Sequence, residues 1–146
     1  MSSIDEWWPQ RAIDLLTEAG WSPGRAVDVT EWRVELEEMG FVMHEAAERV
    51  LVEFGGLLLE AEGTGVRHGR CALELDPLLG VGSRKSFDDF AAKAGTRDLY
   101  PIGEVDWGHA SLAIDPDGQV LMLWGPGFTR LGKGRDAIVR ATEGDY

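Results

Sequence analysis

The chain has 146 residues, of which 44% are hydrophobic, and this predicts one globular domain spanning residues 1–146. No apolar run reaches the roughly 18 residues of a membrane span, and the N-terminus lacks the basic and apolar regions of a signal peptide. The single cysteine, Cys71, excludes an internal disulfide and a cysteine zinc cluster. We therefore expect a cytoplasmic protein that has no membrane partner.

Acidic residues outnumber basic residues 26 to 14, which gives a formal net charge of −12. The first 62 residues hold 14 of the acidic residues and only 4 of the basic ones. A surface of this kind repels nucleic acid and anionic membranes and attracts a basic partner. The alternative interpretation is that the acidity only keeps the domain soluble.

The first 55 residues predict three helices, each ending at a glycine. The first begins at Pro9 and carries its apolar residues at helical spacing. Gly20 lies where a left-handed cap is needed, and Trp21 can fold back onto Leu16.

The second helix is predicted to begin with Asp28 as its N-cap and to end at Gly40. Its inner face is expected to bury Trp32, Leu36 and Met39. The third helix is predicted from about residue 44 to Gly55-Gly56, with Gly55 in a left-handed conformation.

The second half of the chain predicts a sheet with two further helices. Strands are expected at residues 57–60, 70–75 and 128–131, with a turn at 62–65. A helix is expected from Ser86, its N-cap, to Ala94, and a last short helix over residues 135–141. Helices followed by a largely antiparallel sheet define an α+β fold, with a short C-terminal helix.

A β-hairpin is predicted inside the stretch from residue 99 to residue 124. Asp115-Pro-Asp-Gly118-Gln is typical of a turn in which Gly118 adopts a positive φ. The turn would pair Ile114 with Val120, and it would place Trp124 at the end of a buried stripe. Apolar residues on the opposite face predict a hairpin that is covered on both sides.

The motifs that resemble catalytic sites are incomplete. Gly127-Phe-Thr-Arg-Leu-Gly-Lys-Gly134 lacks the hydroxyl residue that a phosphate-binding loop needs, which favours a glycine-rich connector. His44-Glu45-Ala-Ala-Glu48 has glutamate where a metallopeptidase helix has its second histidine, so His44 and Glu48 are expected to face solvent. His68 has no second ligand at short spacing. We expect neither enzymatic activity nor a cofactor or metal.

Trp107 follows Glu104-Val-Asp106, and an aromatic residue beside acidic residues can serve as an anchor for a protein partner. The alternative is a packed tryptophan and two solvated acidic residues at the end of a strand.

Several short motifs together resemble the SUKH superfamily of bacterial immunity proteins, in its third subfamily. In order, the motifs are Leu16-x-x-Ala19-Gly20-Trp21-x-Pro23-Gly24-Arg25, Phe54-Gly55-Gly56-Leu57, Leu99-x-Pro101-Ile102-Gly103, Ile114-Asp115-x-x-Gly118-x-Val120 and Leu131-Gly132. They extend from about residue 10 to residue 144. The residues in these motifs are expected to shape the scaffold rather than to bind the partner.

The resemblance implies a non-enzymatic domain that binds a polymorphic or contact-dependent toxin and blocks it in the producing cell. The toxins of this superfamily are often nucleases or deaminases, which need a basic surface to reach nucleic acid. The candidate partner-binding residues are therefore Glu31, Glu35, Glu38, Glu45, Glu48, Glu104, Asp106 and Trp107.

Two other functions are consistent with the sequence. Relatives in the wider superfamily serve as regulatory or scaffolding domains, and the segment from Gly127 to Gly134 leaves nucleotide binding as a third interpretation.

Overall fold

The computed structural model describes residues 7–60 and 72–145, and it confirms the α+β class. Its elements in chain order are α1 (Gln10–Ala19), α2 (Thr30–Glu38), α3 (Glu45–Phe54), β1 (Leu58–Leu59), β2 (Leu73–Glu74), α4 (Arg84–Ala94), β3 (Tyr100–Val105), the 3₁₀ turn η1 (Asp106–Gly108), β4 (Ala110–Ile114), β5 (Gln119–Trp124), β6 (Gly127–Lys133) and α5 (Gly134–Glu143). The expected turn at 62–65, His68 and Cys71 lie outside the described residues.

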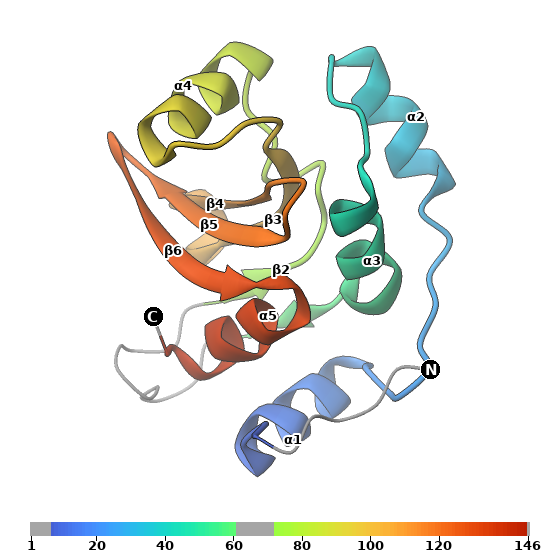
Figure 1. Cartoon of the computed structure of the whole chain (residues 1–146). Helices are drawn as coiled ribbons and strands as arrows, with labels where there is room; N and C mark the ends of the chain where they lie inside the picture. Colours follow the sequence, from blue (N-terminus) through green and yellow to red (C-terminus); the bar gives the residue numbers. More distant parts are fainter. Residues whose placement is uncertain (1–6, 61–71, 146) are drawn as a thin grey trace.

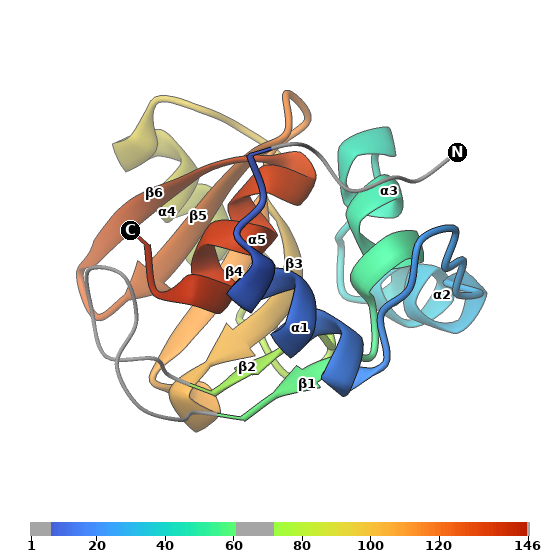
Figure 2. The ribbon, with the colours of Figure 1, turned by 90° about the horizontal axis from the view of Figure 1, so that it is seen from below.

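The described strands form one antiparallel sheet in the order β1-β2-β3-β4-β5-β6, so neighbours in sequence are also neighbours in the sheet. Figure 1 shows α4 on one side of β5 and β6, and α5 with α1 on the other side. The α2 and α3 helices lie beside the sheet, with α2 outermost, and the view from below in Figure 2 shows the same arrangement.

The central hairpin is paired as the sequence predicts. Ile114 lies opposite Val120, and Leu121 and Leu123 on the other face are buried as well. Trp124 does not continue the buried stripe, because its side chain is 45% exposed and its indole nitrogen donates to Thr129 Oγ1. The hairpin is therefore covered on both faces except at its open end.

The turn of this hairpin is held by Asp115, which is only 2% exposed. Its Oδ1 accepts hydrogen bonds from the backbone N–H groups of Asp117 and Gln119, and its Oδ2 accepts one from the Thr96 hydroxyl. Gly118 has φ +92°, which confirms the predicted left-handed position.

The predicted glycine caps are confirmed at the first two helices and wrong at the third. Gly20 has φ +117° and Gly40 has φ +93°. Gly55 has φ −57°, and the left-handed residue is its neighbour Gly56 with φ +85°. A Cβ on Gly55 would lie 2.6 Å from the Trp32 ring and 2.4 Å from the carbonyl oxygen of Leu51. Close packing, rather than a positive φ, therefore requires glycine at this position.

The predicted N-caps of α2 and α4 are wrong by one and three residues. Val29 is the N-cap of α2, while Asp28 accepts hydrogen bonds from the Thr30 hydroxyl and backbone N–H. These hydrogen bonds lower the pKa of Asp28. Ser83, rather than Ser86, caps α4 by accepting from the Ser86 backbone N–H.

We expect Gly118→Val to lower the free energy of unfolding by about 1–3 kcal/mol, because a β-branched residue is strained at positive φ. Chemical denaturation of the purified variant measures this loss. Asp117→Ala, in the same turn but with an exposed side chain, is the control. An unfolding free energy unchanged by Gly118→Val would contradict the assigned turn.

Candidate partner-binding surfaces

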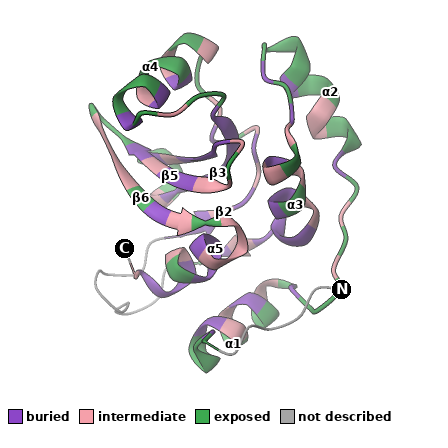
Figure 3. Ribbon diagram, viewed as in Figure 1, coloured by how far each residue is buried: buried purple, intermediate pink, exposed green. Residues whose placement is uncertain are grey.

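The α2 helix is the most exposed of the three N-terminal helices, and Leu36 is its one fully buried residue. Figure 3 shows this helix as largely exposed. Glu31, Glu35 and Glu38 are exposed, and no residue that the structure describes forms an ion pair with any of them. These three predicted residues therefore present uncompensated negative charge.

The two predicted glutamates of α3, unlike those of α2, each form an ion pair with an arginine. Glu45 pairs with Arg49 one turn along the helix, and Glu48 pairs at 2.9 Å with Arg33 of α2. Glu48 is half-buried, and its side chain is 46% exposed. The five glutamates predicted from the sequence thus divide into an uncompensated group on α2 and a compensated pair on α3.

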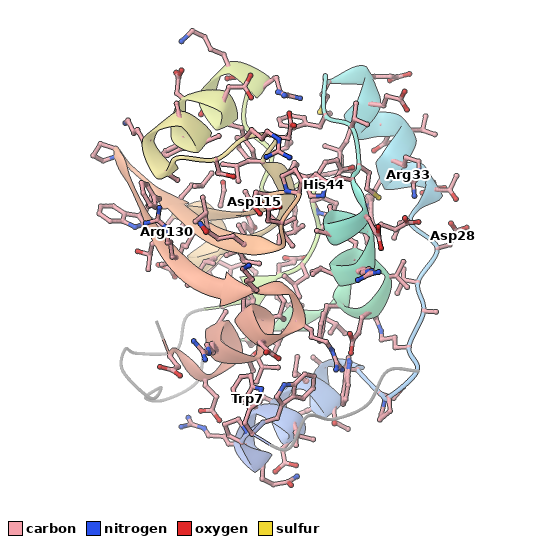
Figure 4. All side chains as sticks on the ribbon, in the orientation of Figure 1. Trp7, Asp28, Arg33, His44, Asp115 and Arg130 are labelled. Atoms are coloured by element: carbon pink, nitrogen blue, oxygen red, sulfur yellow. The ribbon has the colours of Figure 1, made fainter. Side chains whose placement is uncertain are left out.

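His44 connects α3 to the sheet and is half-buried, contrary to the expected solvent exposure. Its Nδ1 accepts a hydrogen bond from the Ala47 backbone N–H at 3.2 Å and so caps α3. Its Nε2 lies 3.1 Å from the carbonyl oxygen of Ile114 and 3.2 Å from that of Asp98. Because Nδ1 accepts, the proton of the neutral ring is on Nε2, where it can be donated to these carbonyls. Figure 4 shows His44 between α3 and the sheet, with Arg33 on α2.

The segment after α2 is held by an aromatic junction. The Phe41 ring lies 5.3 Å from that of Phe87 and 6.4 Å from that of Tyr100, both in edge-on geometry. Arg84 of α4 donates to the carbonyl oxygen of Gly40 at 2.7 Å. Burial raises the pKa of Tyr100 to about 12, and its buried hydroxyl has no hydrogen-bond partner among the described residues.

A buried carboxylate links the N-terminal segment, α3 and α5. Glu53 of α3 accepts from both Nε and a terminal nitrogen of Arg135, at 3.1 and 3.0 Å, and from Trp21 Nε1 at 3.1 Å. The Arg135 guanidinium in turn lies 4.6 Å from the centre of the Trp8 ring. Arg25 donates to the backbone carbonyl oxygens of Glu53 and Gly55, both at 2.7 Å. Glu53 and Arg135 are far apart in the chain, and no local motif in the sequence marks them as partners.

Trp107 lies in the β3–β4 connection and is 62% exposed. It has φ +55°, and the preceding Asp106 has φ +52°, a conformation that is strained for residues other than glycine. Glu104 of β3 lies directly opposite Glu74 of β2, which makes this end of the sheet acidic as well.

Trp107 and the glutamates of α2 belong to two separate surfaces. Tyr100, at the start of β3, contacts Phe41 and His44, whereas Trp107 lies beyond the other end of this six-residue strand. A strand of that length spans about 17 Å. In Figure 2 the turn between β3 and β4 and the α2 helix lie on different sides of the molecule.

A cleft of about 530 Å³ lies between α3, the Asp115–Gln119 turn and the start of α5. Its wall includes Lys133 and Gly134, the last residues of the glycine-rich motif. Here β6 leads directly into α5, and the Gly134 N–H donates to the carbonyl oxygen of Gly118 at 2.8 Å. A backbone donor that a phosphate-binding loop would use is therefore already engaged, which favours the connector interpretation.

The remaining motif residues have structural roles. Trp21 is 2% exposed, and Pro101 and Gly103 flank an irregularity in the pairing of β3 with β4. A Cβ on Gly103 would lie 2.4 Å from the carbonyl oxygen of Glu74, so only glycine fits there.

Within residues 7–60 and 72–145, no three His, Cys, Asp or Glu side chains are placed to hold a metal ion. In the same ranges, no helix is both long and apolar enough to cross a membrane.

These features define an α+β fold that presents exposed acidic and apolar side chains. The model of the SUKH-3 immunity protein family matches residues 8–140, and the chain belongs to this family. Comparison with curated proteins and with solved structures gives no match.

We expect Glu53→Gln to lower the free energy of unfolding by about 1–3 kcal/mol, because it removes the negative charge from a buried, hydrogen-bonded ion pair with Arg135. A double-mutant cycle with Arg135→Gln should show that the two losses are not additive. Glu18→Gln, on the exposed side of α1, is the matched control. Additive losses would show that the two residues stabilise the fold independently.

Tyr100 should make the protein sensitive to alkaline pH. Its folded-state pKa of about 12 lies above the ordinary value of 10, so its contribution to stability is complete below pH 10 and is lost as the pH rises toward 12. Tyr100→Phe should flatten this decline and leave stability at pH 7 unchanged or higher, as measured by urea unfolding. Tyr146→Phe, at the other tyrosine, is the control. An identical alkaline decline in Tyr100→Phe and wild type would contradict this role.

Proposed function

We propose that this protein neutralises a cognate toxin in the cytoplasm of the producing cell by stoichiometric binding rather than by catalysis. Membership of the immunity protein family supports a toxin as the partner. The uncompensated glutamates of α2 are the observation that supports a basic toxin surface. A nuclease or a nucleic-acid deaminase presents such a surface, because its substrate is a polyanion.

Exposed charges of this kind act mainly on the rate of encounter. A single exposed ion pair contributes less than about 1 kcal/mol, whereas the summed field of several like charges accelerates association. The compensated Glu45 and Glu48 add less to this field than the three α2 residues do. Trp107, with Glu104 and Asp106, is a second candidate contact on a different surface.

The wild-type protein should form a 1:1 complex with the toxin domain encoded beside its gene, and co-expression should restore growth of cells that produce this toxin. Size-exclusion chromatography with light scattering and a growth assay measure the two effects. If the wild-type chain neither binds nor protects, the proposal is wrong and the scaffolding role is favoured.

Association should slow clearly as salt rises from low to physiological concentration, while dissociation changes less. Stopped-flow or surface-plasmon measurements separate the two rates. An association rate that does not depend on salt would show that the acidic helices contribute only solubility.

A further inference from the structure

The outer face of α2 combines acidic residues with an exposed apolar side chain. Glu31, Val34, Glu35 and Glu38 follow the i, i+3, i+4, i+7 spacing, so they form one stripe along the helix. Val34 is 53% exposed and lies between the glutamates on this stripe. The opposite face carries Leu36, which is buried.

Exposed apolar residues continue past the C-terminal end of the helix. Met39, which the sequence pattern placed in the core, is 49% exposed, and Val42 is 71% exposed. Seven large hydrophobic residues are exposed in the described part of the chain, and three of them, Val34, Met39 and Val42, lie within this one segment. Of these three, Val34 lies on the acidic stripe itself, so an apolar side chain and negative charge are presented together on the outer face of α2.

The fold holds this segment without using its outer side chains. Leu36 packs into the core, Phe41 packs between Phe87 and Tyr100, and Arg33 pairs with Glu48 of α3. Neither Val34 nor the three glutamates of the stripe take part in these contacts. Substitutions on the outer stripe can therefore change binding without removing a contact that stabilises the fold.

The charge of the segment indicates the chemistry of the partner. Residues 30–42 contain Glu31, Glu35, Glu37 and Glu38, and their one basic residue, Arg33, is already paired. Nucleic acid and anionic lipid would be repelled, and a second copy docking by the same face would bring the acidic stripes together. A basic protein groove with an apolar floor complements both the charge and the exposed valine.

We propose that α2 docks by its outer stripe into the basic nucleic-acid-binding groove of the toxin, with Val34 as the central apolar contact. This inference rests on the proposed function and assigns its binding surface. Glu31, Glu35 and Glu38 face the cationic walls of the groove, where a helical rise of about 1.5 Å per residue spaces their charges by about 6 and 4.5 Å.

The test measures both rate constants with the toxin domain encoded beside the gene, inactivated in its catalytic site so that it can be purified. Glu35→Lys/Glu38→Lys should slow association at low salt by about tenfold or more. The matched control is Asp14→Lys/Glu18→Lys, which makes the same change in net charge on the exposed side of α1 and should have a much smaller effect. Thermal unfolding of each variant verifies that the fold is retained.

Val34→Ala tests the apolar contact separately. It should leave association nearly unchanged and speed dissociation by about fivefold or more, as expected for a central contact. Trp124→Ala is the control, because it removes another exposed hydrophobic residue at the β5–β6 turn, on the side of the sheet away from α2. Its dissociation rate should match that of wild type.

The outcomes separate the two proposals. If the wild-type chain does not bind the toxin domain, the proposed function fails, and the inference fails with it. If the wild-type chain binds while both α2 variants match their controls, the function stands and the assignment to α2 is wrong. In that case Trp107→Ala identifies whether the β3–β4 end of the sheet is the contact surface.

Discussion

The packing of the N-terminal half depends on the hydrogen bonds made by the buried carboxylate of Glu53. Its two oxygens receive the Arg135 guanidinium and the Trp21 indole, so a single side chain connects α3, α5 and the segment after α1. Such a group is costly to bury alone and is stabilised only when its hydrogen bonds are satisfied. The geometry of the three segments is therefore coupled, because moving any one of them would break a hydrogen bond to this buried carboxylate.

This coupling explains how α2 can remain exposed. The helices on either side of it are fixed, α1 through the Trp21 segment and α3 through Glu53, and the α2–α3 connection is fixed by Phe41. With both flanking segments fixed, α2 is held by inner contacts alone: Leu36 in the core, the Trp32 ring against Gly55, and Arg33 paired with Glu48. A helix that contributes little to the core can vary on its outer side with little loss of stability.

Most features that depend on neighbours in sequence were predictable, apart from the N-caps placed at Asp28 and Ser86, and features that depend on distant contacts were not. Gly20 and Gly118 were predicted correctly because a helix end and a tight turn are local backbone geometries. The prediction of a positive φ at Gly55 was wrong. Glycine is required there by the carbonyl oxygen of Leu51 and by the ring of Trp32, which lies more than twenty residues away in the chain. Periodicity placed Met39 and Trp124 inside, but each lies at the end of its element, where the covering layer stops. The candidate glutamates were predictable as charges, but the pairing of Glu48 was not, because it depends on Arg33 reaching α3 from α2.

The separation of folding contacts from exposed contacts has a consequence for specificity. Steering by charge acts on any basic partner, so the acidic stripe of α2 alone would distinguish poorly between toxins. Discrimination between partners requires side chains that fit one groove but clash with another groove or leave it unfilled. The exposed Val34, Met39 and Val42 can have this role. Because these residues carry none of the buried contacts around Glu53, the same scaffold can present different apolar residues at the same positions. The fold thereby supports a change of partner without a change of core.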